Sequence, residues 1–138
     1  GAAVGFAFLT RPGERQGFGR RDVVLLLQIM DEPSARHVYQ RMRLASRAFR
    51  PLDDASLYVS RLAVSPHARR TGIGTHLVEG AVERAREAGL KWIELDVASD
   101  NAVALKFYLS RGFSAVAESS VSTETGSLAY RRLRRPVA

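Results

Sequence analysis

The segment 69–74, Arg-Arg-Thr-Gly-Ile-Gly, combines two arginines and two glycines directly before an amphipathic stretch. A glycine loop that opens a helix presents backbone N–H groups to an anion, and the helix N-terminus adds partial positive charge. Arg69 and Arg70 add full positive charges. Glycine lets a bulky anion approach the backbone, which a larger side chain would prevent. These residue types in this order predict a site for a phosphate-bearing ligand.

Other side chains able to do nucleophilic or metal chemistry are few. The chain has no cysteine, which excludes a disulfide framework, a thiolate nucleophile and a cysteine-ligated metal. The histidines His37, His67 and His76 show no ligand spacing. We interpret His67 and His76 as loop and helix-surface residues, whereas His37 could face the substrate or be solvated on a polar helix. We therefore expect no metal site.

The elements that must position the phosphate loop follow from hydrophobic periodicity and turn residues. The segment 73–88 has its apolar residues on one helical face and is followed by Gly89, which ends a helix well. Trp92, Glu94 and Asp96 share one face of an alternating segment. We expect strands at 3–10, 22–30, 57–64, 92–97, 113–117 and 125–133, and helices at 33–49, 73–88 and 101–111.

This order of elements implies an α/β fold of the α+β type, with a mixed sheet covered by helices. The length of 138 residues suits a single domain spanning residues 1–138, and no repeat or linker interrupts it.

The chain carries a formal net charge of +7, which favours polyanionic ligands. It lacks a recognition helix and a basic strand surface with interleaved aromatic residues, so nucleic-acid binding is not expected. No apolar run reaches membrane-spanning length and no signal peptide is visible, so we expect a cytoplasmic protein without membrane contact. The chain begins at Gly1 rather than Met, which indicates that residues can precede it.

Residues 57–116 resemble the GNAT superfamily of acetyl-CoA-dependent N-acetyltransferases. The likeness depends on the order of several motifs, because an isolated Gly-x-Gly would be weak. These motifs are the strand end Leu62-Ala63-Val64, then Pro66, then Arg-x-x-Gly-x-Gly at Arg69, Gly72 and Gly74, then Asp100-Asn101, Ala104, Phe107-Tyr108 and Gly112-Phe113.

The resemblance implies a splayed GNAT-like sheet and acetyl-CoA as co-substrate. The main chain of Leu62, Ala63 and Val64 would bind the pantetheine arm, with Asn101 and Ala104 beside it. The pyrophosphate would be held by the loop residues Ala68, Arg69, Arg70, Thr71, Gly72, Ile73, Gly74 and Thr75.

The resemblance also implies two proton transfers. Tyr108 would approach the sulfur and protonate the departing thiolate. Asp96 matches the position of an acidic residue in relatives that acetylate protein N-termini, and Glu94 on the same face is the second candidate for the base. The alternative for both carboxylates is that they face solvent or pair with arginines.

Two departures from the family pattern stand out. Members usually begin with a strand and two helices before the strand expected at 3–10. We find no pattern for them in this sequence, so either the sequence lacks them or the protein completes its site in another way. The helix expected at 33–49 is additional. It could cover the acceptor cleft, form the seam of a homodimer, or pack on the sheet with a solvated arginine face; lining the cleft, it would favour acidic acceptors.

The predicted function is transfer of acetyl from acetyl-CoA to a primary amine by direct attack. The acceptor could be a protein N-terminus, a lysine or a small-molecule amine. The alternative is a non-catalytic acyl-CoA-binding regulatory module of the same fold.

Overall fold

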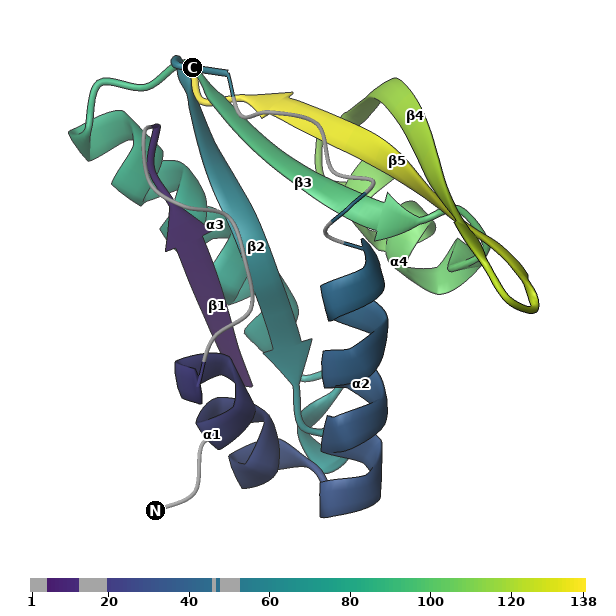
Figure 1. Cartoon of the computed structure of the whole chain (residues 1–138). Helices are drawn as coiled ribbons and strands as arrows, with labels where there is room; N and C mark the ends of the chain where they lie inside the picture. The colour runs from purple at the N-terminus through teal and green to yellow at the C-terminus, as the bar shows by residue number, and fades with distance from the viewer. Residues whose placement is uncertain (1–4, 13–19, 46, 48–52) are drawn as a thin grey trace.

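Five strands form one mixed sheet in the order β1-β2-β3-β5-β4 (Figure 1). The computed structural model describes residues 5–12, 20–45, 47 and 53–138. The expected mixed sheet flanked by helices is confirmed. The elements are β1 (Gly5–Thr10), α1 (Arg20–Ile29), α2 (Glu32–Ala45), β2 (Ser56–Val64), the short 3-10 helix η1 (Pro66–Ala68), α3 (Ile73–Glu87), β3 (Trp92–Ala98), α4 (Ala102–Leu109), β4 (Ser114–Thr123) and β5 (Gly126–Pro136).

The sheet splays between its two central strands. β2 and β3 are parallel, but their pairing covers only Ser56–Tyr58 against Trp92–Glu94, and the strands then diverge. On its other edge β2 pairs with β1, with a register shift that leaves Ser60 as an extra residue. Such a bulge bends a strand and increases its twist. The splay expected from the family resemblance is therefore present.

The segment 22–30 is helical, and the prediction of a strand there was wrong. Helix α1 covers Arg20–Ile29, with Leu26 and Ile29 buried and Leu27 47% exposed. In a strand Leu27 and Ile29 would share a face, whereas in a helix a spacing of three places Leu26 and Ile29 together. A continuous apolar run fits both structures until its packing partner is known.

Two helices, rather than the single one expected, lie between β1 and β2. The helix expected at 33–49 is present as α2 and ends at Ala45; residues 46 and 48–52 lie outside the described part of the chain. The last two strands extend further than expected, to Thr123 and Pro136, because they continue as one antiparallel hairpin.

Each face of the sheet has its own apolar core. α3 and α4 pack behind the sheet in Figure 1, where Val78, Val82 and Leu105 meet strand residues such as Ile93 and Leu133. In front, α1 and α2 pack against β1 through a smaller cluster of Phe6, Leu26, Ile29 and Ala35. The splay thus lies between two helical layers.

Candidate active site

A cleft of about 630 Å³ opens where β2 and β3 diverge. Over the residues described, the edge of β2 that faces β3 pairs with no strand beyond Tyr58, so this edge borders the cleft. The strands contribute Val59, Ser60, Leu62, Ala63, Leu95, Asp96, Val97 and Ala98; the remaining lining residues are Phe6, Leu26, His37, Val38, Arg41, Met42, Asp100, Asn101, Ala104, Tyr108 and Tyr130.

The predicted phosphate loop lies between the end of β2 and the start of α3. Arg70 has φ 64° and Gly72 has φ 85°, both left-handed, and His76 N–H bonds the Gly72 carbonyl. Among the described residues no backbone carbonyl accepts the N–H groups from Arg70 to Thr75. Alternating backbone conformations with free N–H groups form an anion-binding nest. The loop has the geometry expected for a phosphate.

Asn101 is the N-cap of α4 and lines the cleft. Its side-chain oxygen accepts a hydrogen bond from Ala104 N–H at 3.1 Å, which caps the helix. The amide nitrogen of Asn101 is therefore the part of this side chain left to donate to a ligand. Leu62, Ala63, Asn101 and Ala104 all line the cleft, whereas Val64 ends β2 beside the loop.

Tyr108 lies at the junction of the cleft and the α3–α4 core. Its ring makes edge-on contacts with Phe107 and Phe113 at centroid distances of 5.0 and 5.4 Å. Burial raises the pKa of Tyr108 to about 12. The side chain therefore stays protonated throughout the neutral and mildly alkaline range, as a proton donor must.

Because of this raised pKa, Tyr108 should make the fold less stable above about pH 10. A tyrosine in the unfolded chain has a pKa near 10, so the unfolded state there binds fewer protons than the folded state. From about pH 9 to about pH 11 the free energy of unfolding should fall by about 1 kcal/mol through this group. Urea unfolding of the wild type and Tyr108→Phe at both pH values measures the difference; an identical pH dependence would contradict it.

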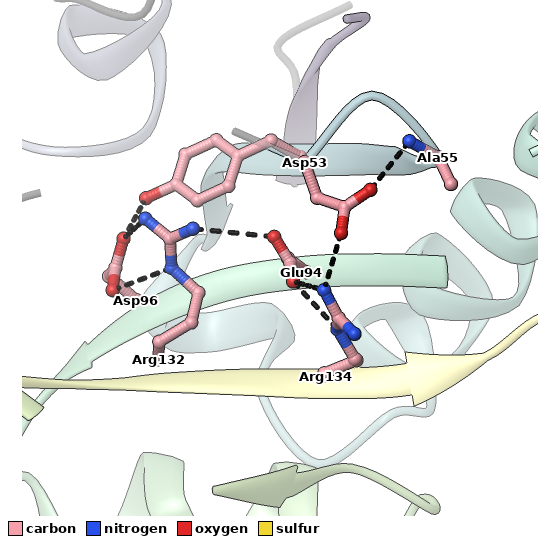
Figure 2. A network of polar contacts seen from close by, with 7 residues as sticks. Asp53, Ala55, Glu94, Asp96, Arg132 and Arg134 are labelled. Atoms are coloured by element: carbon pink, nitrogen blue, oxygen red, sulfur yellow. Dashed lines mark hydrogen bonds and ion pairs between the residues drawn. The ribbon is translucent and has the colours of Figure 1, made fainter. Parts of the chain in front are cut away.

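Glu94 and Asp96 belong to a network of ion pairs at the point where the strands diverge (Figure 2). Asp96 accepts from Arg132 Nε at 3.0 Å and Nη2 at 2.9 Å, and from the Tyr58 hydroxyl at 2.6 Å. Glu94 accepts from Arg132 Nη1 at 3.3 Å and from Arg134 Nε at 2.7 Å. Both carboxylates thus have each oxygen engaged.

Burial opposes the charge of Arg132, but the hydrogen bonds and attraction of Asp96, with Tyr58 and Glu94, outweigh it and raise the pKa of Arg132. The guanidinium stays charged and ties β3 to β5, while Tyr58 ties β2 to β3. Arg134 extends the network to Asp53 at 3.1 Å. These contacts hold the strands together immediately before they separate.

Of the two candidate bases, Asp96 lines the cleft and Glu94 does not. The Asp96 side chain is only 2% exposed, although the residue as a whole is not buried, so its accessible surface is on its backbone. The arginines and Tyr58 were not among the predicted site residues. The signal that could have found them is the alternation of Arg132 and Arg134, but only the register pairs them with Asp96 and Glu94.

Helix α2 lines the cleft through His37, Val38, Arg41 and Met42. The structure supports two of the three interpretations of this helix: it covers the cleft, and it packs on β1 through Ala35 while its arginines stay exposed. Burial raises the pKa of Tyr130 on β5, the charge and hydrogen bonding of Arg41 oppose this, and the charges of Asp100 and Asp96 add to it.

His67 and His76 lie on the surface beside the phosphate loop, as expected, with His67 Nδ1 2.9 Å from Ser65 Oγ. Within the described ranges no group of three or more His, Asp or Glu side chains is placed to bind a metal ion. None of the helices described is both long and apolar enough to cross a bilayer.

Comparison with known proteins shows the family to which the chain belongs. The chain is 37% identical over 59 residues to GCN5-related N-acetyltransferase 6, chloroplastic, of Arabidopsis thaliana, covering 43% of this chain and 20% of that protein. It is 36% identical over 62 residues to the ribosomal protein bS18-alanine N-acetyltransferase of Escherichia coli, covering 45% of this chain and 40% of the relative. The chain therefore spans less than half the length of either relative.

A GNAT-family structure from Desulfovibrio desulfuricans superposes on 96% of this chain and 100% of its own, with a TM-score of 0.60 at 16% identity, which shows a shared fold. The model of the acetyltransferase (GNAT) family matches residues 3–113. With a splayed sheet, an open strand edge and a matching family model, the chain belongs to the GNAT family of acetyltransferases.

Proposed function

We propose that this protein transfers the acetyl group of acetyl-CoA to a primary amine by direct attack. The observation that carries the proposal is the continuity of the open β2 edge with the unpaired N–H groups of the loop. An extended pantetheine arm can pair with a strand edge as an added strand does, while its pyrophosphate reaches the nest. One ligand of this shape would satisfy both features.

In this proposal the arm lies along Leu62–Val64, with Asn101 and Ala104 on its other side, and the loop 68–75 binds the pyrophosphate. The thioester then lies in the cleft beside Tyr108. The amine nitrogen attacks the carbonyl carbon, the C–S bond breaks, and the sulfur takes a proton from the Tyr108 hydroxyl. The pKa of a thiol is near 8.5 and that of Tyr108 is about 12, so proton transfer from Tyr108 to a free thiolate is unfavourable by about 5 kcal/mol. The proton is therefore donated while the C–S bond breaks.

The amine must lose a proton as it attacks. Asp96 is the proposed proton acceptor. A water molecule would carry the proton from the amine to it, because the Asp96 oxygens are already bonded to Arg132 and Tyr58. Glu94 lies outside the cleft lining and is proposed only as a partner of the arginines.

The acceptor class is proposed from the cleft and the relatives together. One relative acts on an alanine of a ribosomal protein, which makes a protein α-amine a first candidate, with lysine and small-molecule amines as alternatives. Arg41 and His37 in the cover favour acceptors that carry a carboxylate near the amine. A screen of peptides, amino acids, polyamines and aminoglycosides with measurement of CoA release would choose among them.

The competing proposal is a non-catalytic acyl-CoA-binding module. It is favoured by one observation, that the carboxylates near the cleft are engaged by arginines. Acetyl-CoA binding without CoA release for every acceptor class would support it over the enzyme.

Acetyl-CoA should raise the melting temperature, and Gly72→Glu should abolish the rise. Gly72 has φ 85°, where another residue is strained by roughly 1–2 kcal/mol, and a carboxylate there repels the pyrophosphate. Cofactor affinity should fall roughly tenfold or more. The matched control is Gly80→Glu, which adds the same charge on the exposed surface of α3, where a Cβ meets nothing within 4 Å. A wild-type melting curve indifferent to acetyl-CoA would overturn the proposed function.

A further inference from the structure

Arg111, just beyond the end of α4, connects that helix to the first turn of α3. Its Nε and Nη2 atoms donate to Thr75 Oγ1 at 2.9 and 2.7 Å. Its Nη1 atom donates to the Phe107 carbonyl at 2.9 Å, and its guanidinium carbon lies 3.8 Å from the centroid of the Phe107 ring. No carboxylate in the described part of the chain pairs with Arg111. An uncompensated positive charge therefore lies beside the phosphate loop.

These contacts determine which hydrogen bonds the Thr75 hydroxyl can still make. A threonine hydroxyl has one proton to donate and two lone pairs to accept with. Two N–H groups of one planar guanidinium approach Oγ1 from the same side, so the proton points away from Arg111. Thr71, the other loop threonine, differs because its hydroxyl donates to the Ala68 carbonyl. Of the two, only Thr75 keeps its proton for a ligand.

Thr75 is the third residue of α3. Side chains in a helix lean toward its N-terminus, so the Thr75 hydroxyl lies over the turn whose N–H groups are unpaired. The helix backbone next to Thr75 packs closely on α4, because a Cβ placed on Gly74 would lie only 3.2 Å from Phe107 Cζ. The first turn of α3 thus packs directly against the helix that carries Tyr108.

We propose that Arg111 is a positioning residue for the cofactor: it holds the Thr75 hydroxyl so that its proton is donated to a pyrophosphate oxygen. This inference rests on the proposed function. It adds a contact between the Thr75 hydroxyl and the pyrophosphate, whose geometry is set by Arg111 at the end of α4. Because Phe107 and Tyr108 are adjacent, the same contacts fix the distance between the phosphate end and the sulfur end of the site.

Thr75→Val tests the contact, because it removes the hydroxyl while keeping the shape of the side chain. The probes are CoA and pantetheine, which lacks the pyrophosphate and nucleotide, each titrated by calorimetry. The dissociation constant for CoA should rise roughly tenfold to a hundredfold, as for a lost hydrogen bond to a charged group, while that for pantetheine is unchanged. Thr75→Ser, the matched control, should retain CoA affinity.

Arg111→Met should weaken CoA binding less than Thr75→Val, because the hydroxyl remains but loses its orientation; Arg111→Lys should restore only part of the affinity. An equal loss of affinity for CoA and for pantetheine in Thr75→Val would indicate a structural role and overturn the inference. Unchanged CoA affinity in Thr75→Val or in Arg111→Met would also overturn it. If wild-type protein binds neither probe, the proposed function itself fails. If Arg111→Met does not fold, the Thr75 variants decide the matter.

Discussion

Tyr108→Phe is expected to lower kcat by roughly 10²- to 10⁴-fold, the range that a positioned general acid contributes, with the dissociation constant for acetyl-CoA changed less than about twofold. The substitution removes one oxygen and leaves the ring contacts with Phe107 and Phe113 in place. Among the described residues no hydrogen-bond partner of this hydroxyl is found. The loss should therefore appear in the chemical step and not in folding or cofactor binding.

The measurement is CoA release under saturating acetyl-CoA with the acceptor found by the screen, beside calorimetric binding of acetyl-CoA. Tyr39→Phe on α2 is the matched control, because Tyr39 is not part of the cleft lining, and its kcat should stay near that of the wild type. Unchanged turnover in Tyr108→Phe would remove this residue from the acid role. Equal losses in kcat and affinity would indicate that it shapes the cofactor site.

Arg132→Leu is expected to lower the free energy of unfolding by about 3–5 kcal/mol, because it leaves the buried Asp96 carboxylate without its cation, while Glu94 keeps only Arg134. Arg132 is 4% exposed and bonds both Asp96 and Glu94. Such a loss is a large share of the roughly 5–15 kcal/mol that stabilises a typical domain. Urea unfolding measures it, and the β2–β3 splay should be disturbed together with stability.

Arg131→Leu is the matched control for this experiment. Arg131 directly precedes Arg132 on β5. Its ion pair with Glu118 is at the surface, with side chains 42% and 69% exposed. Surface pairs contribute about 1 kcal/mol or less. Adding Asp96→Asn to Arg132→Leu removes one uncompensated charge and should recover part of the stability. Equal effects of Arg131→Leu and Arg132→Leu would show that burial does not govern these ion pairs.

Helix α1 was predicted as a strand because its sequence fits both structures. Its run of Val, Leu and Ile residues satisfies the apolar requirement of a buried strand as well as that of a helix. Only packing against Phe6 of β1 and Ala35 of α2 selects the helical face of Leu26 and Ile29. The helices α3 and α4, by contrast, were predicted closely, because their periodicity and end residues are local.

The features of the candidate site also fall into two groups, those set by neighbouring residues and those set by residues distant in sequence. The glycine loop before α3 was located from sequence because a left-handed glycine and a free helix N-terminus depend on neighbouring residues alone, and its binding of phosphate stays a prediction. The roles of Asp96, Glu94 and Tyr108 stay predictions. Sequence could not show that Asp96 and Glu94 are bound by arginines, because those arginines lie more than thirty positions away.

By itself the sequence therefore determined the order of most elements, the position of the glycine loop and the family resemblance, since each is encoded in a continuous stretch of chain. The tertiary structure alone decided which residues share the cleft. The β3–β5 register places Arg132 against Asp96, the divergence of β2 and β3 opens a strand edge, and α2 closes over it. These features arise from packing between segments distant in sequence, whose relative positions no local pattern specifies.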